Sequence, residues 1–556
     1  MASDSQTNIE FNKRWNAMRF EAYNGWMSSW QALQTYINQK RGWFESQANR
    51  GQMIDHKTLL DSHATQANRI LASGLLSGMT SPSRPWFRLT LDDVTLDAAP
   101  NVRAWLDETQ RRMVEVLNKS NIYSAFYNAY EELGQFGTAC YLILDDFHSV
   151  IRCRNFTAGE YYLGLDSRGR VNSFARYFWM NVGQLVQEFG LENCTKQTQS
   201  MFQQNQVDTW VKVQQLIEPN ESRIPDKSDF KNMPYRSAYW EFGNGQDQFL
   251  DKRGFIRFPV IAPRWETITT DQVYGVGPGW YALGNIKQLQ KTTLDKLLAQ
   301  EKLHNPPMVK DASVEGHVNL LPGGVTTISG SVPNSGPRAS YQIDPKLESF
   351  IEMINHLYDT IDKDYYVNLF LMLMNVDRTN MTATEVAERQ QEKIMMMGPV
   401  LYKIQEELLD PTMEIVFENM AAAGLIPEPP AEIQGMNLKV KYVSILAQAQ
   451  QSLGVEQINR VVGFVGQSAA VNPDIIDVID WDEAAREVGK LEGTPSKIFR
   501  DKADVDAIRA QKQQMQQATM AAQVANSGAD TAQKLGNADM EGDNALTRMA
   551  SAMPKR

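Results

Sequence analysis

The spacing of apolar residues divides the first half of the chain into helices followed by strands. From Phe11 to Ile37, large apolar residues recur every three or four positions, which predicts one long amphipathic helix. The same spacing predicts three more helices, over residues 56–79, 102–117 and 122–136. Between residues 138 and 266 the period falls to two, as in strands that bury one face. We therefore predict an α+β fold for this half.

Short strands separated by Gly, Asn, Asp and Pro turns fill this second region. An earlier strand is predicted where Phe87, Leu89 and Leu91 alternate with polar residues. The helix-like sequence NVGQLVQEFG, residues 181–190, interrupts the series. The candidate strands are residues 138–146, 149–156, 170–180, 209–219, 236–242 and 254–266.

Two helices flank a compact insertion in the third quarter of the chain. The first, over residues 278–304, is stopped by Asn305-Pro306-Pro307, because proline lacks an N–H donor and clashes with the preceding turn. The second, over residues 345–371, carries apolar residues at helical spacing. Residues 305–344 between them are rich in Gly, Pro and Ser, and the segment is longer than most connections. We expect a small folded module at the end of a helical hairpin.

The sequence MNVDRTNMTATEVAERQQEK, residues 374–393, joins a soft segment to a firmly marked helix start. Thr382 and Glu385 have the spacing of a capping box, so the helix should begin near Ala383. Its two Xaa-Pro steps, Gly398-Pro399 and Asp410-Pro411, are expected to kink or interrupt it. The soft segment offers methionines, amides and one guanidinium, on Met372, Met374, Asn375, Arg378, Asn380 and Met381.

The last quarter of the chain is predicted to be mostly helical. LKVKYVSIL, from residue 438, indicates a strand, and residues 446–500 indicate several short helices. An Ala-, Gln- and Met-rich helix is expected over residues 501–528, and residues 529–556 should form a frayed tail.

Composition and charge restrict the function. A chain of 556 residues with 42% hydrophobic residues can bury several cores. The net charge of -11 argues against sequence-independent clamping of nucleic acid, which needs a surplus of Lys and Arg. No stretch approaches the roughly 20 apolar residues that cross a bilayer, so we expect no membrane partner. Three scattered cysteines, Cys140, Cys153 and Cys194, predict free thiols rather than a disulfide framework.

No motif for catalysis stands out, and we predict neither a cofactor nor a metal. The sequence lacks a GxxxxGK[ST] loop, and GVGPG at residues 275–279 is better interpreted as a hinge between sheet and helix, because Pro278 removes an amide donor. The six histidines never fall in HExxH. Paired acids at Asp92-Asp93, Asp145-Asp146 and in DWDE at residues 480–483 are interpreted as turn and helix-cap acids rather than nuclease ligands.

Three lysines on the helix before the insertion, Lys287, Lys291 and Lys296, are the remaining candidates for contact with a phosphate backbone. For each taken singly, a solvated face or a salt bridge with a neighbouring acid is the favoured interpretation.

Four stretches in order resemble the head-to-tail connector, or portal, family of short-tailed bacteriophages. They are residues 69–89 (RILASGLLSGMTSPSRPWFRL), 274–308 (YGVGPGWYALGNIKQLQKTTLDKLLAQEKLHNPPM), 378–393 (RTNMTATEVAERQQEK) and 480–500 (DWDEAAREVGKLEGTPSKIFR). The second and third are specific, since an abrupt helix, a Pro-Pro stop, an insertion, a second helix, a Met-rich loop and a capped helix follow in the order that such portals use.

The resemblance implies a ring, usually of twelve subunits, at one capsid vertex. A separate terminase pumps double-stranded DNA through the ring, and the DNA leaves by the same channel. Major capsid and scaffolding proteins, terminase and tail adaptor proteins are the implied partners. The chain would be a virion component that assembles in the host cytoplasm, and it would not be an enzyme.

The family's parts can be assigned to residue ranges of this chain. The tunnel loop would face DNA, the pair Thr382–Glu385 would fix where the loop ends, and the stem lysines could line the channel. The ranges are 1–277 wing, 278–304 stem helix, 305–344 clip, 345–371 stem helix, 372–382 tunnel loop, 383–437 kinked wing helix and turn, 438–500 crown, 501–528 helix of a short C-terminal barrel, and 529–556 tail.

Two other functions stay open. A ring-shaped tail adaptor without a packaging role would share much of the architecture. A metal-dependent nuclease would have to use acids such as Asp480 and Asp482, which turns and caps already explain. The portal interpretation is favoured because it accounts for the hairpin, the insertion and the loop together.

Overall fold

The chain has a mixed helix and sheet architecture with two compact units, residues 1–450 and 451–556. The mixed fold class predicted from the sequence is confirmed at this level. The computed structural model describes residues 2–44, 59–97, 99–224, 229, 232–243, 248–306, 308–309, 338–339, 347–374, 396–435, 438–443, 446, 458, 461–468, 473–491, 500 and 504–520.

The predicted helix from Phe11 to Ile37 is two helices, α1 (Ala2–Gly25) and α2 (Met27–Tyr36). The break falls at Trp26, whose backbone leaves the helical region with φ -124°. The indole of Trp26 packs against Trp280 and Tyr274, with ring centroids 5.4 and 5.6 Å away. Tertiary packing of this aromatic residue therefore overrides the local helical pattern.

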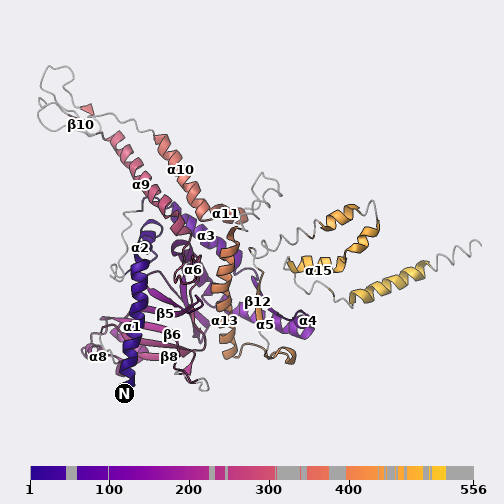
Figure 1. Ribbon diagram of the computed structural model, residues 1–556, viewed down its shortest axis with the longest axis horizontal. Coiled ribbons are helices and arrows are strands. Elements are labelled where there is room, and N and C mark those ends of the chain that lie inside the picture. The colour runs from indigo at the N-terminus through magenta and orange to yellow at the C-terminus, as the bar shows by residue number, and fades with distance from the viewer. Residues whose placement is uncertain are drawn as a thin grey trace, which may run out of the picture. The chain divides into compact units, whose positions relative to one another are not determined.

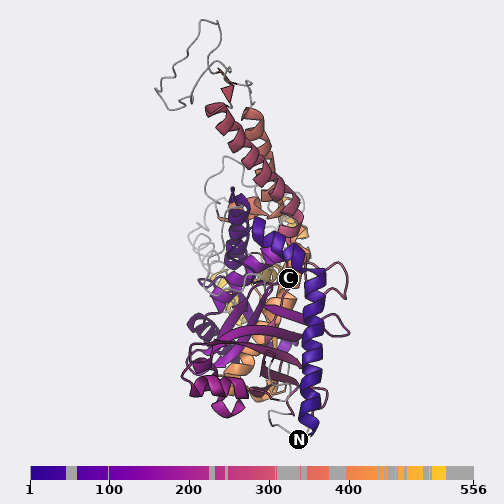
Figure 2. The ribbon, with the colours of Figure 1, turned by 90° about the vertical axis from the view of Figure 1, so that its left-hand side faces the viewer.

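A five-stranded antiparallel sheet, in the order β4-β5-β6-β7-β8, forms the largest β element. Helix α1 lies beside it in both views (Figures 1 and 2), and Trp15 Nε1 donates to the carbonyl of Arg176 over 3.2 Å. The strand β4 was not predicted, because its sequence YYLGL does not alternate. The strands are β4 (Tyr161–Leu165), β5 (Val171–Asn181), β6 (Trp210–Pro219), β7 (Tyr235–Glu241) and β8 (Asp251–Phe255).

Two small helices lie in the connection between β5 and β6. Helix α7 (Val182–Phe189) has the predicted position and starts with a capping box between Asn181 and Gln184. Helix α8 (Lys196–Gln203) follows a short 3₁₀ turn, Leu191–Asn193.

Two smaller sheets lie outside the hairpin insertion. Strands β3 (Val150–Phe156), β2 (Cys140–Asp146) and β9 (Val260–Ile261) pair antiparallel in that order. The predicted strand 254–266 is split between β8 and β9, because Pro259 and Pro263 cannot donate to a ladder. Strand β1 (Phe87–Leu91) pairs with β12 (Leu438–Tyr442), so the first strand of the predicted crown is joined to the N-terminal region.

Helix α6 (Ile122–Phe136) is the centre of the core, and every residue from Ala129 to Phe136 is buried. It packs against α3 (His63–Met79), against strand β3 and against the hairpin helix α9 (Pro278–His304). Helix α3 was predicted to begin at residue 56 but begins at His63, whose N–H donates to Asp61 Oδ1 over 2.8 Å. Helices α4 (Val94–Asp97) and α5 (Pro100–Lys119) lie between β1 and α6 in sequence.

The predicted helical hairpin is present as α9 (Pro278–His304) and α10 (Leu347–Asp364), which lie side by side in both views (Figures 1 and 2). The second helix does not continue to residue 371 as predicted. It breaks at Tyr366, which has a φ of 55°. Tyr365 before it is fully buried, and the ring of Tyr366 lies 6.3 Å from that of Trp265. Helix α11 (Val367–Met374) follows. Two-residue strands, Met308–Val309 and Arg338–Ala339, pair antiparallel within the insertion.

The helix after the soft segment runs through both prolines. Residues 396–404 are α-helical, Gln405–Leu409 form a π-helical turn, and α13 (Asp410–Ala422) continues from it. A wider turn before Pro411 suits a residue that has no N–H to donate. A 3₁₀ turn, Ala431–Ile433, then precedes β12.

The second unit consists of short helices in the part that the structure describes. They are residues 461–468, a 3₁₀ segment Pro473–Val478, α15 (Trp481–Leu491) and residues 504–520. The N–H groups of Asp482 and Glu483 donate to Asp480 Oδ1 over 3.1 and 3.0 Å, so Asp480 caps α15. Asp482 pairs with Arg509 from the helix 504–520.

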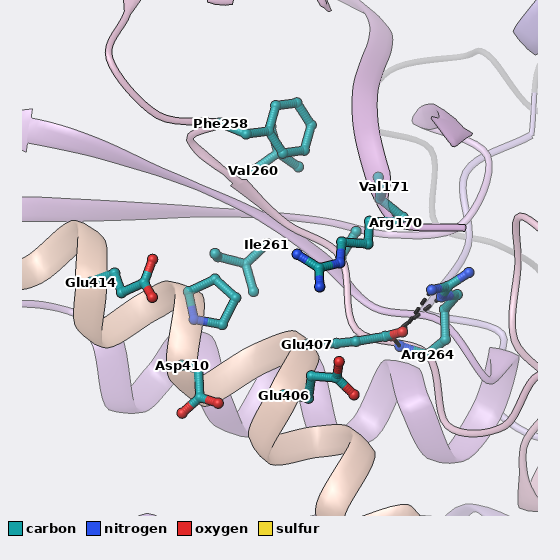
Figure 3. Close-up of a pocket in the computed structure, with 12 residues that line it drawn as sticks. Arg170, Val171, Phe258, Val260, Ile261, Arg264, Glu406, Glu407, Asp410 and Glu414 are labelled. Atoms are coloured by element: carbon teal, nitrogen blue, oxygen red, sulfur yellow. Dashed lines mark hydrogen bonds and ion pairs between the residues drawn. The ribbon is translucent and has the colours of Figure 1, made fainter. Parts of the chain in front are cut away.

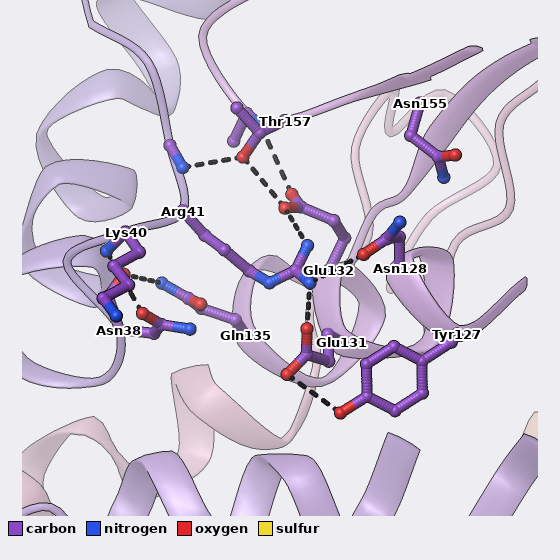
Figure 4. Close-up of polar contacts among 12 residues, drawn as sticks. Asn38, Lys40, Arg41, Tyr127, Asn128, Glu131, Glu132, Gln135, Asn155 and Thr157 are labelled. Atoms are coloured by element: carbon purple, nitrogen blue, oxygen red, sulfur yellow. Dashed lines mark hydrogen bonds and ion pairs between the residues drawn. The ribbon is translucent and has the colours of Figure 1, made fainter. Parts of the chain in front are cut away.

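A buried ionic network ties the end of the N-terminal helices to α6 (Figure 4). Arg41 donates to Glu131, to Glu132 Oε1 over 3.0 Å and to Asn128 Oδ1 over 3.1 Å. Thr157 Oγ1 donates to Glu132 Oε1 over 2.9 Å. Burial raises the pKa of the Glu132 carboxyl, and Arg41 opposes this shift. Because two buried carboxylates depend on Arg41, its loss should leave charge without a partner.

We expect Arg41→Met to lower the stability of the fold by about 3–5 kcal/mol, the usual cost of breaking a buried pair. The folded-state pKa of Glu132 lies above its unfolded value, so stability falls as the pH rises between the two. Removing Arg41 raises that folded-state pKa further, and the loss should be larger at pH 8 than at pH 5. Thermal unfolding midpoints at both pH values measure it. Arg69→Met is the matched control, since Arg69 is 56% exposed and 4.0 Å from Glu131; equal effects of the two variants would contradict the prediction.

Candidate functional site

The base of the helical hairpin is the candidate site, because it fixes where α9 and α10 project. The glycine run 275–279 precedes and starts α9, and it packs backbone to backbone on the end of α6. A Cβ at Gly277 would lie 2.5 Å from the carbonyl oxygen of Leu133, and a Cβ at Gly279 would lie 2.5 Å from that of Gln135. Gly137, with a φ of +80°, ends α6 at the same contact. These glycines are required by close packing.

The amides of the glycine run are also used within the protein. Gly275 N donates to Thr138 Oγ1 over 2.7 Å, and Val276 N donates to the Glu266 carbonyl over 2.9 Å. Trp280 Nε1, one turn into α9, donates to the Phe136 carbonyl over 2.9 Å. The interpretation of GVGPG as a hinge between sheet and helix therefore agrees with its contacts, since two of its amides are already bonded.

A polar latch holds the segment before α3 against both hairpin helices. Gln290 of α9 accepts from the N–H groups of Leu60 and Asp61 over 2.8 and 3.0 Å, and its amide donates to the Asp61 carbonyl over 2.7 Å. His63 Nε2 is 2.8 Å from Asp362 Oδ1, and its ring stacks on Tyr358 at 4.1 Å. These residues were not predicted as a site, because they lie up to about 300 positions apart and each is an ordinary polar residue locally.

Asp61 connects the latch to α10 through a hydrogen bond with Tyr358. The hydroxyl of Tyr358 donates to Asp61 Oδ2, and burial together with this carboxylate raises the pKa of Tyr358 to about 12. Tyr358 therefore stays protonated and remains a donor over the ordinary pH range.

A cavity of about 320 Å³ lies between β9 and the helical segment that contains the π turn (Figure 3). Arg264, only 7% exposed, binds Glu407 through Nη2 over 2.6 Å and donates to the carbonyls of Gln272 and Gly169. Glu406, Asp410 and Glu414 also line the cavity. Across the described residues, no group of three His, Cys, Asp or Glu side chains is arranged to hold a metal ion. The Arg264–Glu407 contact joins the segment between β9 and α9 to the π turn.

The three predicted stem lysines do not share one face of α9. Lys287 is exposed with its ammonium 5.5 Å from the ring centroid of Tyr36, and Lys291 pairs with Asp295 over 2.9 Å. Lys296 is partly buried and lies one turn after Thr292, which contacts Met353 of α10. Their role in lining a channel stays a prediction.

The predicted tunnel loop is described only at its start. Helix α11 extends to Met374, so the backbones of Met372 and Met374 are helical rather than part of a loop. Asn375, Arg378, Asn380, Met381 and the predicted capping pair Thr382 and Glu385 lie outside the described residues.

The other chemical candidates have structural roles where the structure describes them. Asp146 Oδ2 accepts from the N–H of Ser149 over 2.9 Å in the β2–β3 turn, and Asp480 caps α15. Cys140, Cys153 and Cys194 are free and buried. Among the described helices, none combines the length and the apolar character needed to cross a membrane.

Comparison with known proteins decides the family. The model of the family described as "Bacteriophage head to tail connecting protein" matches residues 9–499. The chain belongs to this connector family. A "Probable portal protein" of Bordetella phage BPP-1 is 39% identical over 541 residues, which are 97% of both chains. A "Portal protein" of Salmonella phage epsilon15 is 38% identical over 528 residues, which are 94% of this chain and 95% of that protein.

Two solved structures resemble this connector more distantly. "Neck of empty GTA particle computed with C6 symmetry" has a TM-score of 0.36 and 9% identity, covering 73% of this chain and 86% of that chain. "Virion of native gene transfer agent (GTA) particle" has a TM-score of 0.29 and 10% identity, covering 72% and 92%. At these scores the likeness adds nothing to the assignment. The family match and the two relatives confirm the predicted function, that of a portal-type connector of the phage virion.

Two glycines of this connector allow a matched test of the hairpin base. We expect Gly277→Ala to destabilise the fold by about 1–3 kcal/mol, because the added Cβ overlaps the Leu133 carbonyl and Gly137 Cα. Gly284→Ala on α9 has open space around it and should be neutral or stabilising by about 0.5–1 kcal/mol. Thermal unfolding of both variants measures the difference, and an equally stable Gly277→Ala chain would disprove the close contact.

The latch can be tested locally through Gln290. Gln290→Ala removes the acceptor for two N–H groups and the donor to the Asp61 carbonyl, so the segment 59–62 should open more often. With a cost of about 1–2 kcal/mol, hydrogen exchange of the Leu60 and Asp61 amides should become about 5–30 times faster. Gln288→Ala, at an exposed position of the same helix, should leave this exchange unchanged. Unchanged exchange in both variants would mean that the latch does not hold the segment.

Proposed function

We propose that this connector is the portal ring at one vertex of the capsid of a short-tailed phage, built from twelve copies of the chain. Double-stranded DNA passes through the ring during packaging, driven by a separate terminase, and again during ejection. The chain itself is a structural component and not an enzyme. The observation that carries the proposal is the match to the connector family over residues 9–499, with two portal relatives at 38–39% identity over nearly the whole chain.

The hairpin supports the assignment of a stem and a clip. Helices α9 and α10 are seated on the core through the glycine contacts and the latch, and they lead to residues 305–344. We assign this insertion to a clip that contacts terminase first and tail adaptor proteins later. The pairing of Met308 with Ala339 and of Val309 with Arg338 joins the two ends of the insertion. A module closed at its base can present a defined surface to these partners.

The tunnel loop is assigned to residues 375–382, which follow α11. Its upstream anchor is firm, because Leu369 and Phe370 are each 1% exposed and Phe370 packs against Gly74 of α3. Methionine and amide side chains in the loop offer soft contacts to passing DNA. Soft side chains that follow a fixed anchor suit a part that touches a moving duplex.

The charge of the assembly favours passage over binding. Twelve copies carry a formal charge of 12 × -11 = -132. A field of this sign repels phosphate and keeps DNA from adhering to the channel wall. Major capsid and scaffolding proteins would contact the outside of the same ring while it assembles in the host cytoplasm.

Deleting residues 374–381 tests the loop. We expect the variant to assemble into rings, because the described core residues on either side, Phe370 and Met397, are kept, but to package or retain much less DNA. Deletion of the eight C-terminal residues 549–556, which also contain two methionines, is the control of equal length. Electron microscopy counts the rings, and the DNA content of purified particles measures packaging.

Normal DNA content and infectivity of the loop variant would exclude the loop's role. A closed ring too narrow for a DNA duplex would instead indicate a tail adaptor without a packaging role. The two results separate the function of the loop from that of the ring.

A further inference from the structure

The two helices of the hairpin carry opposite charge. Helix α9 has four lysines and two acidic residues, a net of 4 - 2 = +2. Helix α10 has five acidic residues and one lysine, a net of 1 - 5 = -4. Some of these charged side chains point away from the other helix of the same hairpin. Those side chains are free to contact another molecule.

The seam between the helices is marked by the contact of Thr292 Oγ1 with Met353 Sδ at 3.9 Å. Each residue turns a helix by about 100°, so a side chain two positions away points in nearly the opposite direction. Leu294 is two positions after Thr292 and is 38% exposed. Lys287, Lys291 and Leu298 lie on its row, because the spacing of 4, 3 and 4 residues returns to the same face. We name Lys287, Lys291, Leu294 and Leu298 the basic flank.

The same construction on α10 gives a flank of opposite sign. Asn355 and Ile351 are each two positions from Met353, and Ile351 is 50% exposed. Glu348, Glu352 and Asp359 lie on the row of Asn355, and all three are exposed. Among the residues that the structure describes, none of these three carboxylates has an ion pair or hydrogen bond. Glu348, Glu352, Asn355 and Asp359 form the acidic flank, on the side of α10 opposite its buried residues Ile354, Leu357 and Ile361. Ile351 lies instead on the row of Tyr358, which contacts Asp61 of the same copy.

The two flanks match in height as well as in sign. Because α9 and α10 run antiparallel, each step along α9 beyond Thr292 corresponds to a step back along α10 from Met353. Leu294 is thus level with Ile351. By the same count Lys291 is level with Ile354, between Glu352 and Asn355, and Lys287 is level with Tyr358, next to Asp359. Lysines therefore stand level with acids when two hairpins are placed side by side.

We propose that the basic flank of one copy docks on the acidic flank of the next copy, which makes the hairpin a heterologous, ring-closing interface. A contact between two different surfaces repeats around a rotation axis and closes into a ring, whereas a self-complementary contact gives only a dimer. The inference rests on the proposed ring and names the partner of α9 within it. It assigns Lys287 and Lys291 to a second copy of this chain instead of to DNA.

The alternatives inside one copy are weak. Lys291 pairs with Asp295 of its own helix, but both are exposed, with side chains 68% and 42% accessible, and such pairs contribute little. Lys287 approaches Tyr36 only at 5.5 Å. Neither contact accounts for the exposed leucines on the same row or for the acidic row of α10, and a neighbouring copy accounts for both.

Charge reversal with complementation tests the docking. One variant, Lys287→Glu with Lys291→Glu, makes both flanks acidic, and another, Glu352→Lys with Asp359→Lys, makes both flanks basic. We expect each variant alone to give about ten-fold fewer rings than the wild type in native mass spectrometry at low salt, because like charges then face each other. An equal mixture of the two should restore rings with an even number of alternating copies. Lys119→Glu with Lys196→Glu makes the same change of net charge at two exposed positions outside the hairpin and should assemble normally.

Cysteine pairing gives a readout that does not need a closed ring. Copies with Leu294→Cys mixed with copies with Glu352→Cys should form a disulfide-linked dimer under mild oxidation, whereas Leu294→Cys copies alone should not. The natural cysteines are buried and do not compete.

Each result has a distinct meaning. Rings from both charge variants, or complementation that fails while the wild type assembles, would overturn the flank docking and leave the ring standing. A wild-type chain that stays monomeric would contradict the proposed ring, and absence of the mixed disulfide would then overturn the docking as well. Intact rings of Lys287→Glu with Lys291→Glu that retain less DNA would assign the lysines to DNA.

Discussion

The hairpin depends on one steric constraint, the backbone contact between the glycine run 275–279 and the end of α6. With Cβ positions only 2.5 Å from the carbonyl oxygens of Leu133 and Gln135, no side chain fits at Gly277 or Gly279. This contact fixes the point and the direction in which α9 leaves the core. The latch at Gln290 and His63 can form only because α9 starts there, and α10 is then positioned against α9. The direction of α9 is thus determined at a few backbone atoms.

The periodicity of the sequence predicted most helices and strands but not the places where they break. The capped helix α7, the alternating strand β1 and the paired helices around the insertion follow from local pattern. The breaks at Trp26 and Tyr366 do not, because each depends on burial of an aromatic residue against a distant segment. Strand β4 and the split of residues 254–266 depend likewise on sheet partners and prolines.

The sequence predicted only part of the candidate site. The role of Lys287, Lys291 and Lys296 in lining a channel stays a prediction, whereas the interpretation of the glycine run as a hinge agrees with its contacts. The latch was not predicted, because Asp61, Gln290 and Tyr358 become neighbours only in the folded chain. The opposite net charge of α9 and α10 was not predicted either, although α10 is rich in acids. It becomes evident only when the lysines of α9 are compared with the acids of the helix beside it.

The opposite charges of α9 and α10 matter for assembly because the chain as a whole is acidic. Copies with a charge of -11 each repel one another, and the repulsion grows as a ring closes. An interface that places Lys287 and Lys291 beside Glu348, Glu352 and Asp359 of the next copy offsets part of this repulsion locally, while the acidic surplus stays on the rest of the molecule. The same net charge that keeps phosphate from adhering therefore coexists with subunit contact, provided that the few basic residues are concentrated where copies meet. On this reasoning, Lys287 and Lys291 of α9 serve the ring by facing the neighbouring subunit.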